Sequence, residues 1–400
     1  MLRVPLASSG LRPKDIRVMN ETLMSASYTM GNKVKKFESE MAKFLGFENF
    51  VMVNSGSSAN LSIFEALLRP VHGHSVLNIG DEVLVPVIAW PTTIWPLVQL
   101  GLKPIFVDIE EKSLAINLAA AEAVLEERRN KVKAIFPIHP LGYAIDHDAI
   151  LNLSRKFNLV YLSDTCEALG AFRNSKHAGK GSKAASFSFY FSHHITTMEG
   201  GGIATDDSSF ADDLRSIRSH GWSRDRSDSN TWTKGMLGSD KKFTFVSTGF
   251  NIRPMEIQGA IGLSQLEDLP SFITRRREIA ATVKHAIKNT PLQMLEGDAW
   301  DTLRHTHHSR MLIALRIPEP KRLAEIKEKL ESLGIETRPP LTGNFLAQPA
   351  AARVLGHRCD PNDYEVANKI TASTFLIGCH HDYTDTQIEY LCEKLIGIFE

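Results

Sequence analysis

The segment Ser188-Phe-Tyr-Phe-Ser-His193-His194-Ile-Thr-Thr-Met-Glu-Gly-Gly-Gly202 decides the fold. It joins two strand-like runs, 185–190 and 202–205, through a pair of adjacent histidines. No lysine occurs between Lys183 and Lys234. On local sequence alone, adjacent histidines are typical of a surface or hydrogen-bonded pair. Their role therefore depends on the strands and motifs around them.

Strand-like runs alternate with helical patterns through the first two thirds of the chain. Seven runs are strand candidates: 50–53, 82–86, 104–107, 133–137, 159–163, 185–190 and 202–205. The helical patterns are 33–45, 58–68, 91–100, 115–129, 145–157 and 207–219. Such alternation predicts an α/β fold with a mainly parallel sheet and helices on both faces. In these sheets ligands bind beyond the carboxyl ends of the strands.

The last third has a different pattern. A long charged helical stretch covers 254–290, and Pro270 predicts a kink or break in it. A strand-like run at 309–317 and helices near 319–333 and 385–399 then predict a smaller α+β unit.

The predicted elements divide the chain into two parts. We expect a large ligand-binding domain over 1–265, and a connecting helix with a smaller C-terminal α+β domain over 266–400. The polar, Gly/Ser/Asp-rich stretch 223–243 predicts a surface loop.

The composition restricts the classes of function. The chain has 400 residues, 43% of them apolar, with 46 basic and 46 acidic residues. This balance does not favour nucleic-acid or membrane-surface binding, and no apolar run approaches the roughly 20 residues that span a bilayer. The N-terminus does not resemble a signal peptide. Four scattered cysteines indicate reduced thiols: Cys166, Cys359, Cys379 and Cys392. We expect a cytoplasmic enzyme without a metal centre.

A glycine-serine turn follows the first strand candidate. In Asn54-Ser-Gly56-Ser57-Ser58-Ala-Asn60, the backbone amides of Ser57 and Ser58 would point from a helix N-terminus toward an anion. Gly56 allows close approach of the backbone. The alternative is an ordinary helix N-cap, and the local sequence leaves both open.

Three further strand ends carry polar or aromatic side chains. Asp164 ends the run 159–163, where a buried carboxylate needs a partner; alternatively it caps the next turn, and the local sequence leaves both open. Glu167 follows one helical turn later. Trp90 follows the run 82–86 and could stack on a planar ligand or belong to the core. Ser188 lies five residues before His193, where its hydroxyl could reach a phosphate.

Taken together, the order and spacing of these motifs resemble the DegT/DnrJ/EryC1/StrS nucleotide-sugar aminotransferases over nearly the whole chain. The likeness includes His139-Pro-Leu-Gly142 with 146–150, the Arg-Ser-His-Gly stretch at 218–221, and Thr248-Gly-Phe-Asn251-Ile-Arg253-Pro-Met-Glu256-Ile-Gln258. In that family a lysine holds pyridoxal phosphate (PLP) covalently. Here the lysine position falls on His193.

The resemblance implies a PLP-dependent aspartate-aminotransferase-like fold (fold type I) and a set of site residues. The cofactor, as PLP or pyridoxamine phosphate (PMP), would be bound by Gly56, Ser57, Ser58, Trp90, Asp164, Glu167, Ser188 and Asn251. Asn251 would reach the phosphate of the neighbouring subunit, which implies a homodimer with shared active sites. His220 and Arg338 are weaker candidates for sugar or glutamate contacts, and His194 would support His193.

Within the family, the His-His segment and Gly334-Ile-Glu-Thr-Arg338 are similar to the 3-dehydratase branch. That branch implies removal of the C-3 hydroxyl from a nucleotide-linked 4-keto-6-deoxyhexose, with L-glutamate as amino donor, toward 3,6-dideoxysugars such as colitose. His193 would act as the base. Some members use an iron–sulfur cluster, which needs about four cysteines; none falls between 167 and 358 here. The cluster-free branch implies GDP-4-keto-6-deoxy-D-mannose as the substrate.

Two alternatives stay open. One is a nucleotide-sugar 4-aminotransferase that works with histidine in place of lysine. The other is a non-catalytic family member that binds no cofactor.

Overall fold

The computed structural model describes residues 2–8, 10–296, 307–356 and 359–399. Its largest element is a seven-stranded sheet of order β1-β9-β8-β5-β4-β2-β3. The strands are β1 (Asn49–Val53), β2 (Glu82–Pro86), β3 (Lys103–Val107), β4 (Val132–Ile135), β5 (Val160–Asp164), β8 (Ala184–Ser188) and β9 (Gly201–Thr205). Only β9 runs antiparallel to its neighbours. The predicted mainly parallel sheet, including all seven of its strands, is confirmed.

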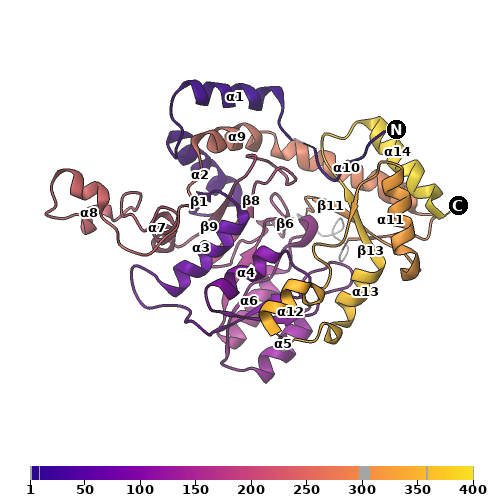
Figure 1. Ribbon diagram of the computed structural model, residues 1–400, viewed down its shortest axis with the longest axis horizontal. Coiled ribbons are helices and arrows are strands. Elements are labelled where there is room, and N and C mark those ends of the chain that lie inside the picture. Colours follow the sequence, from indigo (N-terminus) through magenta and orange to yellow (C-terminus); the bar gives the residue numbers. More distant parts are fainter. Residues whose placement is uncertain (1, 9, 297–306, 357–358, 400) are drawn as a thin grey trace.

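Helices cover both faces of this sheet (Figure 1). They are α2 (Asn32–Leu45), α3 (Gly56–Leu68), α4 (Pro91–Gln99), α5 (Leu118–Glu127), α6 (His147–Phe157) and α7 (Ser208–Ile217). Alternate strand residues point to opposite faces, so Val51 and Val53 pack under α3, α4 and α7, whereas Phe50 and Met52 pack under α2. The sheet is therefore buried on both sides.

The histidine segment connects two neighbouring antiparallel strands, β8 and β9, with Ser188 opposite Gly201. A Cβ atom on Gly201 would lie 2.4 Å from the backbone nitrogen of Gly56, and one on Gly202 would lie 2.2 Å from the Phe50 ring. Glycine is required at both positions because the neighbouring atoms leave no room for a side chain. This close approach places the turn before α3 against the end of β8.

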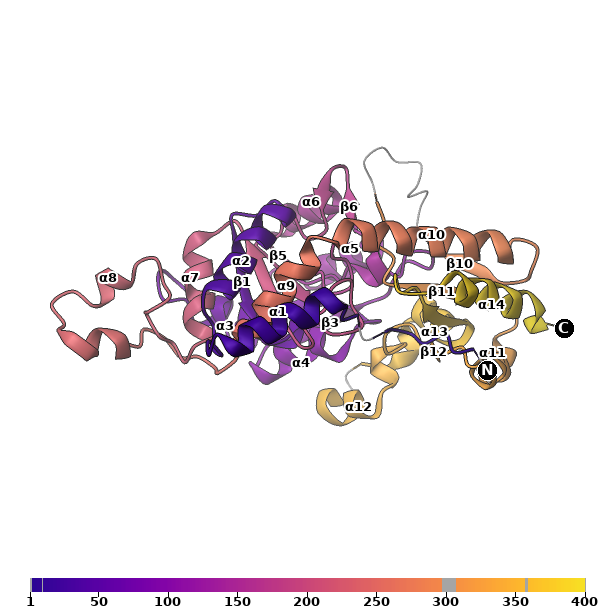
Figure 2. The same cartoon turned by 90° about the horizontal axis from the view of Figure 1, so that it is seen from above.

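A second sheet of order β10-β11-β13-β12 forms most of the C-terminal part. Its strands are β10 (Gln293–Leu295), β11 (Leu312–Arg316), β12 (Thr337–Arg338) and β13 (Thr374–Gly378). The remaining helices of this part are α10 (Leu269–Ile287), α11 (Leu323–Ser332), α12 (Pro349–Leu355), α13 (Glu365–Ser373) and α14 (Asp385–Ile396). Figure 2 shows α10 running beside α14. A domain boundary at 265/266 stays a prediction.

Several elements differ from the sequence-based expectations. The stretch 254–290 is two helices, α9 (Glu256–Leu266) and α10, and Pro270 lies in the first turn of α10, so the predicted break is confirmed. The expected surface loop 223–243 contains α8 (Ser229–Trp232) and a short 3-10 helix, Gly238–Phe243. Helix α1 (Pro13–Met24), the hairpin strands β6 (Phe172–Arg173) and β7 (Lys176–His177), and strand β13 were not predicted.

The segment 223–245, which we call the projecting segment, extends away from the body of the molecule (Figures 1 and 2). Buried Arg226 fixes its base through hydrogen bonds to Asp213 (2.8 Å) and Asp228 (2.6 Å). None of the helices in the described ranges is long and apolar enough to cross a bilayer.

Buried neutral histidines make the fold sensitive to acid. His177 is 2% exposed; its Nδ1 lies 2.7 Å from the Ala178 carbonyl oxygen, and its Nε2 accepts a hydrogen bond from the Gly170 amide at 2.7 Å. Burial lowers the pKa of His177 to about 4. The unfolded chain therefore binds a proton below pH 6.5 that the folded chain does not, and stability falls as the pH falls through this window.

We expect the His177→Gln variant to lose less stability on acidification than the wild type. From pH 7 to pH 5, His177 should account for roughly 2 kcal/mol of the decrease in the free energy of unfolding. Urea unfolding at the two pH values measures this decrease. The variant of exposed His285, His285→Gln, is the control and should behave as the wild type. Equal decreases in His177→Gln and wild type would contradict the expectation.

Candidate active site

A cavity of about 370 Å³ opens at the carboxyl edge of the large sheet. It is lined by the residues that follow β1, β2, β4, β5 and β8, together with residues of the C-terminal part. The predicted site residues in its lining are Gly56, Ser57, Trp90, Asp164, Glu167, Ser188, His193 and Arg338. The fold thus brings together side chains that are up to 282 residues apart (56 to 338).

Asp164 forms the buried acidic end of the cavity. Its Oδ2 accepts hydrogen bonds from Asn60 Nδ2 (2.9 Å) and Thr93 Oγ1 (2.8 Å), and its Oδ1 accepts one from the Cys166 amide (3.2 Å). Within the described residues, no Lys, Arg or His forms an ion pair with it. A carboxylate that is only 7% exposed and held by neutral donors is well suited to a cationic ligand group.

The N-terminus of α3 faces the same cavity. Ser55 is the N-cap, and its side chain accepts from the Ser58 amide at 3.1 Å, while the Ser58 hydroxyl donates to Asn54 at 2.6 Å. A Cβ atom on Gly56 would lie 2.7 Å from Ser188 Cβ, which explains the glycine. Gly56, Ser57 and Ser188 line the cavity and are placed to meet an anion. The Ser58 hydroxyl is engaged at the cap, and its contact with a phosphate stays a prediction.

Trp90 and Arg338 meet across the cavity. Trp90 caps α4 and is 49% exposed, which a core tryptophan would not be. The guanidinium carbon of Arg338, on β12, lies 5.4 Å from the centroid of the Trp90 ring. Arg338 forms no ion pair with any described residue. The cavity therefore carries an aromatic face next to a cation that is available to an anionic ligand.

Glu167 lies on the side of the cavity nearest Arg338. Its Oε2 accepts a hydrogen bond from the Leu141 amide at 2.9 Å. Burial raises the pKa of Glu167, and the charge of Arg338 opposes that rise. This carboxyl group therefore holds a proton more readily than an exposed glutamate does.

His193 is half-buried in the wall of the cavity, after the end of β8. Its amide donates to the Tyr190 carbonyl at 2.9 Å, and its carbonyl accepts from Arg276 at 3.2 Å. Nδ1 is buried with no hydrogen-bond partner, which leaves Nε2 as the nitrogen that can act on a ligand. Burial, with the charges of Arg276 and Arg338, lowers the pKa of His193 to about 4, so the ring is neutral at pH 7.

His220 and Asn251 lie outside the cavity lining. They are neighbours through an isolated bridge between Ser219 and Asn251 and through the hydrogen bond from the His220 amide to the Phe250 carbonyl, 2.8 Å. Asn251 is exposed, and its Oδ1 accepts from Arg253 at 3.1 Å. The fold does not bring these two predicted residues to the cavity of their own chain.

Other lining residues escaped the sequence analysis. They are Ser55, Thr92, Thr93, Ile138, His139, Cys166, Tyr190, Ser192, Glu199, Met311 and Leu341. Ser192, next to His193, and Thr93, just after Trp90, could have been found by their closeness in sequence to predicted residues. Met311 and Leu341 had no such signal, because they reach the cavity through the packing of the two sheets.

One group of side chains has donor atoms of the kinds that bind metals. His380, His381 and Asp382 place such atoms within 4.8 Å of one another. The two imidazole rings stack at 4.2 Å with a 29° interplanar angle, so their in-plane lone pairs run side by side rather than toward one point. His380 Nδ1 also accepts from the Asp382 amide at 3.2 Å. This geometry does not favour a metal, and an enzyme without one stays a prediction.

Known proteins resemble this chain over its whole length. A GDP-4-keto-6-deoxy-D-mannose 3-dehydratase of Yersinia pseudotuberculosis is 36% identical over 402 residues, covering 98% of each chain. The solved structure of the E. coli GDP-4-keto-6-deoxy-D-mannose-3-dehydratase, with bound hydrated PLP, has a TM-score of 0.89 and 35% identity, and covers 99% of this chain and 100% of that one.

A further structure of a GDP-4-keto-6-deoxymannose-3-dehydratase contains a trapped PLP-glutamate geminal diamine. It has a TM-score of 0.88 and 34% identity, over 98% of this chain and 100% of that one. The sequence profile of one family matches residues 11–396. This protein is therefore a member of the DegT/DnrJ/EryC1/StrS aminotransferase family, with the aspartate-aminotransferase-like fold that its sequence predicted.

Proposed function

We propose that this protein is a PLP/PMP-dependent 3-dehydratase that removes the C-3 hydroxyl group of GDP-4-keto-6-deoxy-D-mannose, with L-glutamate as amino donor. The observation that carries the proposal is His193. It lines the cavity, the family resemblance aligns it with the lysine that holds PLP, and the cavity lining contains no lysine. The relatives named as 3-dehydratases of this GDP-sugar support the choice of substrate.

The residues of the cavity fit PLP. One oxygen of Asp164, Oδ1, accepts a single long hydrogen bond, from the Cys166 amide at 3.2 Å. This oxygen would hold the protonated pyridine nitrogen. Gly56, Ser57 and Ser188, at the α3 N-terminus, would hold the phosphate, and Trp90 would lie against the ring. When bound, PLP supplies a protonated ring that accepts the electrons of the bond being broken.

His193 is the proton carrier in this proposal. Its ring is neutral at physiological pH because burial and two nearby cations lower its pKa to about 4. Nε2 can therefore accept a proton in the first half of the reaction. The resulting imidazolium then gives its proton to the C-3 hydroxyl oxygen as that group leaves. Nε2 of His193 would therefore take up the proton in the first half of the reaction and donate it in the second half.

The absence of lysine directs the reaction toward loss of the hydroxyl group. Without a covalent anchor, the cofactor would be held only by the contacts described above. No internal amine would then displace the sugar from the cofactor and complete a transamination. Of the four cysteines, only Cys166 lines the cavity, so its lining does not provide the four thiolates that an iron–sulfur cluster needs.

Arg338 would bind an anionic group of glutamate or of the sugar nucleotide. It is a cation in the cavity without an ion-pair partner among the described residues, and Glu167 lies close enough for their charges to interact. Glu167, which keeps its proton more readily than usual, would face the edge of the cofactor.

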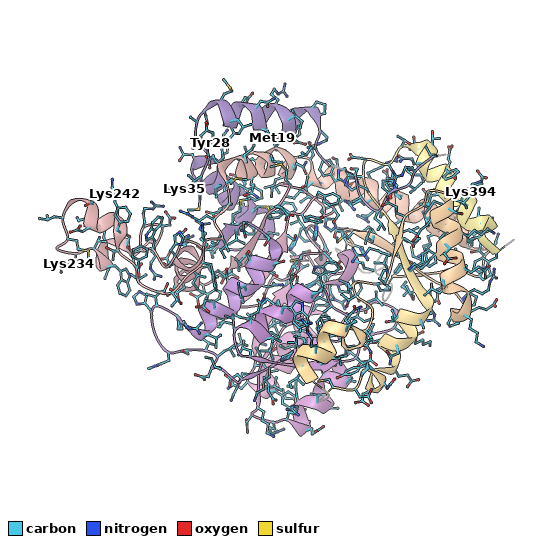
Figure 3. The ribbon with its side chains drawn as sticks, viewed as in Figure 1. Met19, Tyr28, Lys35, Lys234, Lys242 and Lys394 are labelled. Carbon is cyan, nitrogen blue, oxygen red and sulfur yellow. The ribbon has the colours of Figure 1, made fainter. Side chains whose placement is uncertain are left out.

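The exposed Asn251 supports a homodimer with shared active sites. It does not line the cavity of its own chain, and several large apolar side chains of the described residues are exposed, among them Tyr28, Leu237, Phe243, Phe245 and Met255. Figure 3 shows Tyr28 beside α1 and Lys234 and Lys242 on the projecting segment. Exposed apolar side chains of this number are typical of an interface. In the dimer, Asn251 and His220 would complete the partner's cavity. We place the enzyme in the cytoplasm, in 3,6-dideoxysugar synthesis.

The proposed reaction predicts a defined product. Protein, PLP, glutamate and GDP-4-keto-6-deoxymannose should give a sugar nucleotide that has lost one oxygen atom, with ammonia and 2-oxoglutarate and without an added reductase. Mass spectrometry of the sugar nucleotide measures this. An amine in place of the ketone would mean that the protein is a 4-aminotransferase. If the GDP-linked sugar stayed unchanged, and the CDP- and dTDP-linked sugars did as well, the result would contradict the proposal.

The His193→Lys variant should link PLP covalently. The introduced amine would lie in the cavity next to the bound cofactor, and borohydride should fix the adduct on the peptide that contains position 193. Dehydratase activity should fall by at least a hundredfold. His285→Lys, at an exposed position of α10 that does not line the cavity, is the control and should show no such label. Full dehydratase activity in His193→Lys would show that His193 is not the base.

Shared active sites predict complementation between two inactive variants. Hybrid dimers of His193→Asn and Asn251→Asp chains contain one site with both changes and one with neither, so an equal mixture should recover about a quarter of wild-type activity. The chains are coexpressed with different tags, and each homodimer alone is the control. If Asn251 acted within its own chain, every hybrid site would carry one change and no activity would return.

A further inference from the structure

Arg276 is the largest side chain that is fully buried among the described residues, at 1% exposure. It lies in the second turn of α10, and no carboxylate of the described chain pairs with it. A buried guanidinium without a counter-ion is costly, because neutral acceptors compensate only part of the lost hydration. Burial accordingly lowers the pKa of Arg276. A buried arginine without a counter-ion therefore suggests a role beyond packing.

The guanidinium donates to backbone carbonyls from three separate segments. Nη1 contacts the carbonyl oxygens of Met311 (3.0 Å) and Cys379 (2.9 Å), and more distantly that of Arg310 (3.4 Å). Nη2 donates to the carbonyl oxygen of His193 at 3.2 Å. Met311 immediately precedes β11 and Cys379 follows β13, so both belong to the small sheet. Arg276 thus fastens the backbone of His193, which comes from the large sheet, to the small sheet.

The same charge acts on the His193 ring. Four groups with charge or ionisable character lie near this ring: Arg276 from α10, Arg338 from β12, His194 from its own loop and Tyr190, whose ring centroid is 6.2 Å from that of His193. Both arginines disfavour the imidazolium and leave His193 neutral and ready to accept a proton. Once protonated, the imidazolium beside these cations is a stronger acid and gives its proton more readily to a leaving hydroxyl group.

We propose that Arg276 is a positioning residue for catalysis, which fixes the backbone of His193 and places a positive charge near its imidazole. The inference rests on the proposed function for its catalytic part, since it assumes that His193 carries the proton. The effect of the Arg276 charge on the pKa of His193 is a property of the protein alone and can be tested without substrate. A purely structural arginine would stabilise the junction of the two sheets without affecting the titration of His193.

Two variants separate the two roles. Arg276→Met removes the charge, and Arg276→Lys keeps a charge but cannot reach all the carbonyl groups. Arg277→Met is the matched control, because Arg277 is the next residue of α10 and is exposed. Deuterium exchange at the imidazole C2 hydrogen, followed by peptide mass spectrometry between pH 3 and 8 on protein without cofactor, reports the titration of each histidine.

The titration midpoint of His193 should lie below pH 5 in wild type, Arg277→Met and Arg276→Lys. In Arg276→Met it should rise by about 0.5 to 1 pH unit, because one of the two cations is gone while burial remains. His177, whose lowered pKa owes nothing to Arg276, is the internal control and should not move. An unchanged midpoint of His193 in Arg276→Met would overturn the electrostatic role.

Kinetics test the positioning role. Arg276→Lys should lower kcat by about 10- to 100-fold with little change in KM, because a displacement of the proton carrier by about 1 Å has effects of this size. A wild-type kcat in Arg276→Lys would overturn the positioning role. This variant tests the positioning role even if Arg276→Met does not fold. If the wild type has no dehydratase activity, the proposed function fails, whereas the titration of His193 still tests the effect of Arg276.

Discussion

A buried carboxylate held only by neutral donors is the constraint on which the site depends. Asp164 stands at the end of β5, where the Asn60 amide and the Thr93 hydroxyl share one of its oxygens. A charge in this position is unfavourable for the isolated chain, because no cation of the described residues approaches it. A ligand that carries a protonated nitrogen removes this cost. The walls of the cavity then follow from the strand order, which gathers the ends of β1, β2, β4, β5 and β8 at one edge.

The part of the cavity wall around His193 has the reverse electrostatic character. There two arginines act on a histidine that burial already keeps neutral. Asp164 and His193 line the same cavity, which therefore contains both an acidic group and a positive field. The charges of the two arginines disfavour a lasting positive charge on His193. In the proposed function, a lysine in place of His193 would be charged more readily and would bind the cofactor covalently, which would change the chemistry of the site.

The sequence predicted the large sheet well because its strands are short apolar runs that both faces bury. Val83, Leu84 and Val85 in β2 are an example, since all three are fully buried. Strand β12, with only Thr337 and Arg338, has no such signal, and it forms because β13 provides an edge to pair with. Helix α1 was missed although it begins at Pro13, because its apolar side chains are partly exposed, among them Ile16 and Leu23.

The site residues also divide into those that the sequence predicted and those that only tertiary packing brings to the site. Gly56, Asp164 and Ser188 stand at a strand end or a helix start, and the family resemblance assigned them, together with His193, to the site; all four line the cavity. Arg276 could not be predicted, since its importance comes from carbonyl groups of Met311, Cys379 and His193 that only tertiary packing brings to it. Asn251 was predicted from the family resemblance, and the single chain leaves it on the surface, outside the cavity of that chain.

The central claim is that neutral His193 removes the proton that starts the reaction. The most direct measurement uses PMP that carries deuterium on its aminomethyl carbon, with the GDP-linked 4-keto sugar, and follows the isotope content of the recovered cofactor by mass spectrometry. Wild-type protein should convert the labelled PMP to PLP that keeps one of the two deuterium atoms, whereas the His193→Asn variant should leave PMP with both. Loss of deuterium at the wild-type rate in His193→Asn would contradict the claim and would assign the proton transfer to another group.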